Sequence, residues 1–258
     1  MKVEKFALIG EKLGHSFSKP IHERYFELSG KNASYELYEI AKESFGAQMN
    51  NIKSVFDGIN ITIPYKVDAM EFADSISDAA KKIGAVNTIL YSPDGVYAHN
   101  TDYFGIIHTF KRFSIEIKDR DIVILGTGGA ARAVAVAVMD MGAKSIKAVS
   151  RTPKSFMDIE VIGYNDKLSG DVLINSTPVG MYPNADASPI DGEISFNAVF
   201  DLIYNPLQTK LMKMAASQGV KAVNGLYMLV SQAIHSEAIW HNEEVNEEII
   251  DKIYGGML

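Results

Sequence analysis

One stretch in the middle of the chain decides its fold: Asp121-Ile122-Val123-Ile124-Leu125, followed by Gly126-Thr127-Gly128-Gly129-Ala130-Ala131. An apolar helix is expected next, from Arg132 to Met141, with Gly142 as its stop. A buried strand, a glycine turn and a helix N-terminus form the local geometry that binds a pyrophosphate, because backbone amides and the helix dipole face the anion. Gly126 permits the tight turn, and Gly128 lets the backbone approach a phosphate. The stretch therefore predicts a Rossmann-like dinucleotide-binding domain.

The position of this motif leaves about a hundred residues upstream, enough for a separate domain. The chain has 258 residues, 47% of them hydrophobic, so it can bury two modest cores. Short apolar or alternating runs predict strands at Phe6–Ile9, Tyr35–Ile40, Gly58–Ile63, Ala85–Tyr91 and Val96–His99. The last two flank the turn Ser92-Pro93-Asp94-Gly95. The first domain is therefore expected to hold a mixed, mostly parallel sheet with one antiparallel hairpin.

A helix from about Tyr103 to Phe113 is expected to lead into the second domain. Further strands of that domain are predicted at Ile146–Ser150, Asp171–Ser176 and Ala198–Tyr204. The stretch Lys154–Ser169 is too short for a full crossover helix and a strand, so we expect a turn there.

After Asn224-Gly225, apolar residues recur at helical spacing, and this helix is expected to pack back on the first domain. The predicted class is α/β with two domains. The first covers residues 1–103 and is completed by helices at about 228–258, and the Rossmann-like domain covers 104–227.

Composition excludes several classes of function. The formal net charge is -7 and basic residues are not clustered, which argues against nucleic acid or an anionic membrane as a partner. No apolar run approaches the roughly 20 residues of a membrane span. There are no cysteines, and the six histidines lack metal-ligand spacing, so we expect no metal and a cytoplasmic location.

The end of the second strand of the Rossmann-like domain indicates the cofactor. Domains that bind NAD place an acid there, whereas this chain has Ser150-Arg151-Thr152. A guanidinium suits a 2′-phosphate, which predicts NADP. The alternative is that Arg151 is a solvated loop residue.

Polar residues of the first domain gather at strand ends and turns, where open α/β sheets bind their ligands. They are Ser16, Ser18, Thr62, Lys66, Asn87, Thr88, Asn100, Thr101 and Asp102. Each has a structural alternative: Ser18 and Thr101 as helix caps, Asn87 as a turn residue, and Lys66 as a surface lysine. Together their hydroxyl, amide, ammonium and carboxylate groups suit a small polyhydroxylated acid and proton transfer to an oxygen.

Eight segments in order carry a family resemblance. They are Gly14-His15-Ser16-Phe17-Ser18, Asn60-Ile61-Thr62-Ile63-Pro64-Tyr65-Lys66, Gly84-Ala85-Val86-Asn87-Thr88, Asn100-Thr101-Asp102, Gly126-Thr127-Gly128-Gly129-Ala130, Asn175-Ser176-Thr177-Pro178-Val179-Gly180-Met181, Asp201-Leu202-Ile203-Tyr204 and Asn224-Gly225-Leu226-Tyr227-Met228-Leu229-Val230-Ser231-Gln232. Nearly end to end, the chain resembles the shikimate/quinate dehydrogenase family.

The resemblance implies a reversible, NADPH-dependent reduction of 3-dehydroshikimate to shikimate, in the chorismate pathway to aromatic amino acids. It implies that Lys66 is the acid/base, with Asp102 as its partner. It also implies substrate contacts from Ser16, Ser18, Thr62, Asn87, Asp102, Tyr204 and Gln232. The implied cofactor contacts are Gly126, Thr127, Gly128, Gly129, Ala130, Ser150, Arg151, Thr152, Leu202, Gly225, Met228 and Asp78.

Three alternatives remain at this point. A quinate or dual-substrate dehydrogenase would accept one more ring hydroxyl and often use NAD. A methylene-tetrahydrofolate dehydrogenase also has two domains and a catalytic lysine, but the serine pair and Gln232 disfavour it. A non-catalytic NADP-binding regulator would need neither Lys66 nor Asp102. The expected partners are small molecules, and the expected assembly is a monomer or homodimer.

Overall fold

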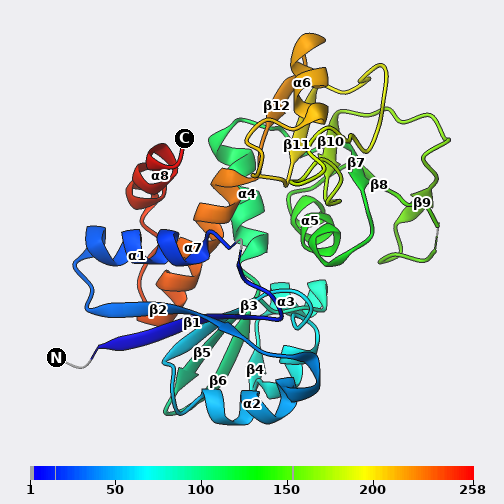
Figure 1. The fold of residues 1–258 in the computed structure, drawn as a ribbon. Coiled ribbons are helices and arrows are strands. Elements are labelled where there is room, and N and C mark those ends of the chain that lie inside the picture. The colour runs from blue at the N-terminus through cyan, green and yellow to red at the C-terminus, as the bar shows by residue number, and fades with distance from the viewer. Residues whose placement is uncertain (1–2, 15, 153) are drawn as a thin grey trace. The chain divides into compact units, whose positions relative to one another are not determined.

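A computed structural model describes residues 3–14, 16–152 and 154–258 (Figure 1). The chain forms two compact units: the first comprises Met1–Phe104 and Val230–Leu258, and the second Gly105–Leu229. His15, which belongs to one of the segments quoted above, and Pro153 lie outside the described residues. The assignment of residues 1–103 and about 228–258 to substrate binding, and of residues 104–227 to cofactor binding, remains a prediction.

The sheet of the first unit has six strands in the order β2-β1-β3-β5-β6-β4. The strands are β1 (Glu4–Gly10), β2 (Ala33–Glu39), β3 (Gly58–Ile61), β4 (Ser75–Ile76), β5 (Thr88–Ser92) and β6 (Gly95–His99). Only β5 runs against its neighbours, so the predicted mostly parallel sheet with one hairpin is confirmed. The strand expected from Ala85 begins later, at Thr88, because Val86 N instead donates to Lys66 O at 2.8 Å.

Helices cover both faces of this sheet (Figure 1). They are α1 (Ser18–Ser29), α2 (Phe45–Ile52), α3 (Asp78–Ile83), α7 (Leu226–His241) and α8 (Glu247–Gly256), with 3-10 turns at Lys42–Ser44 and Asp68–Phe72. Side chains of β1 alternate between the faces: Phe6 stacks on Trp240 of α7 at 4.5 Å, and Ile9 joins the core beside α2. A strand buried on both sides is apolar throughout, which explains the run in β1.

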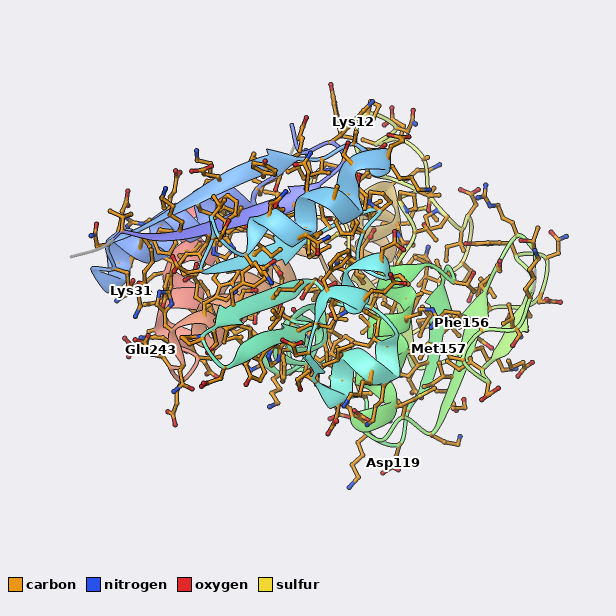
Figure 2. The ribbon with its side chains drawn as sticks, turned by 90° about the horizontal axis from the view of Figure 1, so that it is seen from below. Lys12, Lys31, Asp119, Phe156, Met157 and Glu243 are labelled. Atoms are coloured by element: carbon orange, nitrogen blue, oxygen red, sulfur yellow. The ribbon has the colours of Figure 1, made fainter. Side chains whose placement is uncertain are left out.

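The ends of α1 and α7 are also tied together. Gly30 ends α1 at a left-handed φ of 69°, and its N–H bonds to Phe26 O. Lys31, next along the chain, pairs with Glu243 just after α7 at 2.5 Å (Figure 2). The two helices are therefore fixed to each other at this end.

The sheet of the second unit is entirely parallel, in the order β12-β11-β10-β7-β8-β9. The strands are β7 (Asp121–Leu125), β8 (Ser145–Val149), β9 (Glu160–Ile162), β10 (Val172–Asn175), β11 (Ala198–Asp201) and β12 (Lys221–Val223). Counted within the unit, this is the 3-2-1-4-5-6 order of dinucleotide-binding domains. The order reverses between β7 and β10, and ligands of such sheets bind at that point, outside the carboxyl ends of the strands.

The described residues of this unit also form α4 (Asp102–Arg112), which starts in the first unit, α5 (Gly129–Asp140), α6 (Lys210–Ser217) and the first turn of α7. Phe110 of α4 meets Phe200 of β11 edge to face at 5.4 Å. As expected, β8 leads to β9 without a helix in residues 150–152 and 154–159. No helix in the described part of the chain is long and apolar enough to cross a membrane.

The helix expected from Arg132 begins three residues earlier, at Gly129. Gly128 is its N-cap, in extended backbone conformation, and Arg132 N bonds to Gly128 O at 3.2 Å. The reason is that Ala130 and Ala131, read as part of the turn, are strong helix formers. The glycine turn is therefore shorter than predicted, and the helix N-terminus lies closer to it.

Candidate active site

Lys66 and Asp102 form an ion pair at one edge of the first sheet. Lys66 follows β3 and Asp102 follows β6, and the carboxyl ends of these two strands point the same way. The Lys66 Nζ to Asp102 Oδ2 distance is 2.5 Å, with side chains 27% and 17% exposed. The reading of Lys66 as a solvated surface lysine is therefore wrong. A half-buried ammonium beside a carboxylate can hold a proton close to a bound ligand.

Asn87 orients the carboxylate of this pair. Its Nδ2 donates to Asp102 Oδ1 at 3.0 Å. Its Oδ1 accepts from Thr101 N at 2.7 Å, from Thr101 Oγ1 at 3.1 Å and from Thr88 Oγ1 at 3.0 Å. Because donors surround one end of the amide, its orientation is fixed with the NH₂ group toward Asp102. Asn87 is thus more than a turn residue.

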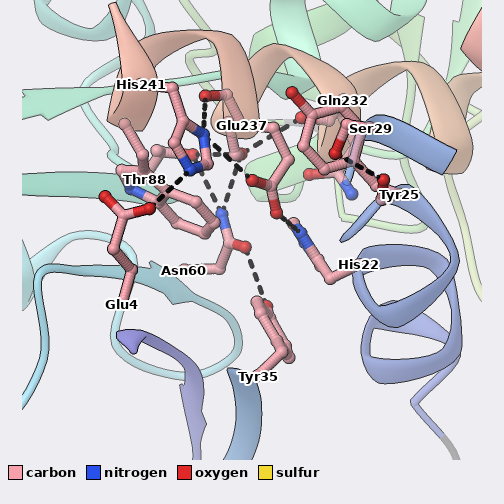
Figure 3. A network of polar contacts seen from close by, with 12 residues as sticks. Glu4, His22, Tyr25, Ser29, Tyr35, Asn60, Thr88, Gln232, Glu237 and His241 are labelled. Atoms are coloured by element: carbon pink, nitrogen blue, oxygen red, sulfur yellow. Dashed lines mark hydrogen bonds and ion pairs between the residues drawn. The ribbon is translucent and has the colours of Figure 1, made fainter. Parts of the chain in front are cut away.

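Gln232 of α7 joins the same network through a row of buried hydroxyls (Figure 3). Thr101 Oγ1 lies 3.3 Å from Gln232 Oε1 and 3.2 Å from Ser236 Oγ. Asn60 Nδ2 in turn donates to Ser236 Oγ at 2.9 Å. Since Ser236 and Asn60 are buried, these bonds fix the face of α7 that carries Gln232 to β3 and the Asn87 segment.

Ser16 and Ser18 lie at the start of α1, in the segment that follows β1. Ser18 N donates to Ser16 Oγ at 3.1 Å, and Phe17 occupies the N-cap position. The reading of Ser18 as the helix cap is therefore wrong, because Ser18 is the first residue of α1 itself. Thr62 follows β3, the parallel neighbour of β1, so all three hydroxyl residues come from the same edge of the sheet.

A buried pair, His22 and Glu237, joins α1 to α7 behind these residues (Figure 3). His22 Nδ1 contacts Glu237 Oε1, and both side chains are 0% exposed. Burial lowers the pKa of His22 to about 3 and raises the pKa of Glu237 well above its usual range. The pair therefore carries no net charge. It connects the helix that begins at Ser18 to the helix that carries Gln232.

The glycine turn of the second unit is tight at Gly126 and open at Gly128 and Gly129. Gly126 has φ 101°, and a Cβ there would lie 3.0 Å from Ser176 Oγ and from Thr177 Cγ2. A Cβ at Gly128 or Gly129 would meet nothing within 4 Å, so the space before α5 is open. Among the described residues no side chain caps α5, so its first amides are available to a ligand. Thr127 lies in the turn, and Ala130 is the second residue of α5.

Arg151 is exposed, two residues after the end of β8. Ser150 Oγ accepts from Thr152 N at 3.3 Å, which folds the loop back around Arg151. The loop residues Ser150, Arg151 and Thr152 include no acid, so this loop offers a ligand one cation and hydroxyl groups.

The segments after β11 and β12 meet closely. Gly225 N donates to Ile203 O at 3.0 Å, and a Cβ on Gly225 would lie 2.0 Å from Leu202 O. Only glycine fits there. Tyr204 is half-buried, and burial raises the pKa of its phenol. Met228 follows in the first turn of α7. The predicted residues Leu202, Tyr204, Gly225 and Met228 thus come from one corner of the second unit.

Asp78 differs from the other predicted ligands. It lies in the first turn of α3 with a side chain 96% exposed, 3.8 Å from Lys81 Nζ. Among the described residues it makes no hydrogen bond or ion pair with the groups above. It is the one predicted cofactor contact to which this geometry adds no support.

Known proteins resemble this chain in both sequence and structure. Residues 8–89 match the family "Shikimate dehydrogenase substrate binding domain". Over 98% of its length the chain is 41% identical to the shikimate dehydrogenase (NADP(+)) of Clostridium beijerinckii, and it covers 97% of that protein. The chain belongs to the shikimate dehydrogenase family.

Solved structures of this family have the same fold. The crystal structure of a chorismate mutase/shikimate 5-dehydrogenase fusion protein from Clostridium acetobutylicum matches with TM-score 0.97 and 45% identity, covering 100% of this chain and 98% of that one. Shikimate 5-dehydrogenase from Thermus thermophilus, solved in complex with NADP(H) and shikimate, matches with TM-score 0.90 and 29% identity over 99% of this chain and 100% of that one.

Within this shikimate dehydrogenase fold, the sequence did not reveal the buried residues that support the site. The sequence pattern does not mark Ser236, His22 or Glu237, and it contains Asn60 only as the first residue of the motif Asn60–Lys66. A polar residue inside an apolar strand, as Asn60 is in Gly58–Ile61, was the available signal. No group of three or more His, Asp or Glu side chains that could hold a metal occurs in the part of the chain described.

Proposed function

We propose that this chain is an NADP-dependent shikimate dehydrogenase that interconverts 3-dehydroshikimate and shikimate, in the pathway to aromatic amino acids. The observation that carries the proposal is the Lys66–Asp102 pair, held by Asn87 in a chain 41% identical to a shikimate dehydrogenase (NADP(+)). The assembly is a monomer or homodimer in the cytoplasm. The absence of cysteine fits the reducing conditions there.

We assign the substrate to the hydroxyl, amide and carboxylate groups at the edge of the first sheet. Ser16 and Ser18 suit the substrate carboxylate, since short hydroxyl donors at a helix start favour an anion. Ring hydroxyls are assigned to Thr62, Asn87, Asp102 and Gln232. Tyr204, which belongs to the second unit, stays an expectation from the family pattern. The network from Asn60 to Gln232 supports the assignment of Asn87, Asp102 and Gln232, because it holds these three side chains before a ligand arrives.

The residues of the second unit suit NADP. The open space before α5 and its uncapped amides fit a pyrophosphate, and Arg151 with Ser150 and Thr152 fits a 2′-phosphate. Leu202, Gly225 and Met228 are assigned to the nicotinamide end. Asp78 stays an expectation from the family pattern. When bound, NADPH supplies the hydride that reduces the ketone carbon.

We assign the proton transfer to Lys66. Its Nζ donates a proton to the carbonyl oxygen, offsets the charge that develops there, and accepts the proton in the reverse direction. Asp102 Oδ2, 2.5 Å from Nζ, fixes the position of the ammonium. Asn87 holds the other carboxylate oxygen, so Asp102 cannot turn away from the lysine.

The test is to follow NADPH absorbance with 3-dehydroshikimate, and then with NADH and with dehydroquinate. We expect turnover with 3-dehydroshikimate and NADPH, and slower turnover with NADH. Comparable rates with dehydroquinate would make the enzyme a dual-substrate dehydrogenase. NADP binding without turnover of either substrate would support a regulator instead.

A further inference from the structure

A buried carboxylate, Asp201, directly precedes Leu202, one of the proposed cofactor residues of the second unit. Asp201 ends β11 and is 0% exposed. Its Oδ1 accepts from Asn175 Nδ2 at 2.9 Å and from Ile203 N at 3.2 Å. Its Oδ2 accepts from Thr209 Oγ1 at 2.7 Å. A buried acid without a cationic partner is costly, so its three donors need an explanation.

Each donor belongs to a different piece of backbone at the carboxyl edge of the sheet. Asn175 ends β10, and its Oδ1 accepts from Thr177 N at 3.0 Å and Thr177 Oγ1 at 2.7 Å. Thr209 also caps α6, where it accepts from Met212 N. Ile203 is the middle residue of Leu202–Tyr204. One carboxylate therefore joins the loop after β10, the loop after β11 and the start of α6.

The Leu202–Tyr204 segment in turn determines the position of Gly225. Ile203 N bonds to Asp201, and Ile203 O accepts from Gly225 N at 3.0 Å. The Gly225 Cα faces Leu202 O so closely that no Cβ fits. A shift of Asp201 would therefore move both backbone segments.

Strand order indicates which half of the cofactor these segments meet. The pyrophosphate turn follows β7, and Arg151 follows β8, on the side of β7 toward β9. Asp201 lies on the other side of β7, in β11, two strands away. A dinucleotide that crosses the carboxyl edge with its 2′-phosphate at β8 must place its other end beyond β10.

We propose that Asp201 is a positioning residue for the nicotinamide half of NADP, holding Leu202–Tyr204 and Gly225 in place without touching the cofactor. The inference rests on the proposed use of NADP. A carboxylate suits this role because it only accepts hydrogen bonds, and three donors converge on it. An apolar side chain would leave the Asn175 amide and the Thr209 hydroxyl buried without that acceptor.

The test compares the affinity for NADP with that for adenosine 2′,5′-bisphosphate, which lacks the nicotinamide half, by calorimetry. Asp201→Ala should weaken NADP binding about tenfold or more and leave bisphosphate binding within about twofold. Asp201→Asn should recover NADP affinity, because its Oδ1 accepts from Ile203 and Asn175 while its NH₂ donates to Thr209 Oγ1. Asp171→Ala is the matched control. Asp171 bonds across strands at the opposite end of the sheet, where it accepts from Asp121 N.

Unchanged NADP affinity in folded Asp201→Ala, or equal loss of both ligands, would overturn the inference. If Asp201→Ala does not fold, Thr209→Val removes the bond to Asp201 together with the cap on Met212 N, and it should weaken NADP binding about threefold without affecting bisphosphate binding. If Thr209→Val binds NADP as tightly as wild type does, that result would also overturn the inference. A wild-type protein that binds NADP but does not reduce 3-dehydroshikimate would contradict the proposed reaction, and the two affinities would still decide this inference.

Discussion

Arg151 is the residue on which the choice between NADP and NAD depends. It stands where NAD-binding domains carry an acid, and the Ser150 to Thr152 contact holds its loop. Arg151→Asp replaces a charge-assisted pair with repulsion, so the NADP/NAD ratio of kcat/KM should fall by about 2–4 kcal/mol in free energy. Steady-state rates with both cofactors measure it, with Arg24→Asp, an exposed arginine on α1, as the charge-matched control. A ratio that hardly moves would remove Arg151 from cofactor recognition.

Asp201 also predicts a pH dependence of stability. Burial raises its pKa from about 3.8 to about 6, with its three hydrogen bonds opposing the shift. Between these two values the folded state binds more protons than the unfolded state, so this group lowers stability as pH rises through about 6. Asp201→Asn lacks that loss. We compare the free energy of unfolding of Asp201→Asn with that of wild type at two pH values. The difference, variant minus wild type, should be about 2–3 kcal/mol larger at pH 7.5 than at pH 4. Urea titrations at the two pH values measure this, and a pH-independent difference would contradict it.

At the scale of elements, α7 connects the core of the first unit to its site. Trp240 stacks on Phe6 and donates from Nε1 to Ile89 O at 3.0 Å, while Gln232 reaches Thr101 nearer the other end of the helix. Gly58 of β3 makes this approach possible, since a Cβ there would lie 2.4 Å from Trp240 Nε1. The position of Gln232 therefore depends on a glycine in a neighbouring strand.

Gly58→Ala should displace α7 and lower the free energy of unfolding by about 1–3 kcal/mol, the usual cost of overpacking. The KM for shikimate should rise more than the KM for NADP, because α7 carries Gln232. Gly46→Ala is the control: Gly46 lies in α2 with nothing within 4 Å of an added Cβ, and alanine there should stabilise by about 0.5–1 kcal/mol. Thermal unfolding and steady-state kinetics of both variants decide the matter. Equal stability losses would show that the contact with Trp240 is unimportant.

At the scale of the whole molecule, the sequence predicted the strands and turns with strong local signals. The glycine turn after β7 and the hairpin turn before β6 are two examples, because glycine and an apolar run mark them directly. The short edge strand β9, with three residues, has no such signal. The polar residues of the site could also be predicted from a local signal, because they interrupt apolar runs at strand ends.

The supporting contacts could not be predicted because they depend on tertiary pairing. Helix α7 is apolar on nearly every face, so its periodicity does not say whether Ser236 and Glu237 point into the unit or toward solvent. The role of Asp201 likewise depends on Asn175 and Thr209, which lie 26 and 8 residues away along the chain. A single sequence contains these residues but not their pairing.

The turnover of Lys66→Ala tests the central claim most directly. The account predicts that kcat for 3-dehydroshikimate reduction falls by about 10²–10⁴, the usual contribution of a general acid, while NADP affinity stays near wild type. Asp102→Ala should lose both catalysis and shikimate affinity. The double variant should be little worse than the poorer single one, because paired groups act as a unit. Lys53→Ala, an exposed lysine after α2, is the control. A near-wild-type kcat in Lys66→Ala would contradict the account.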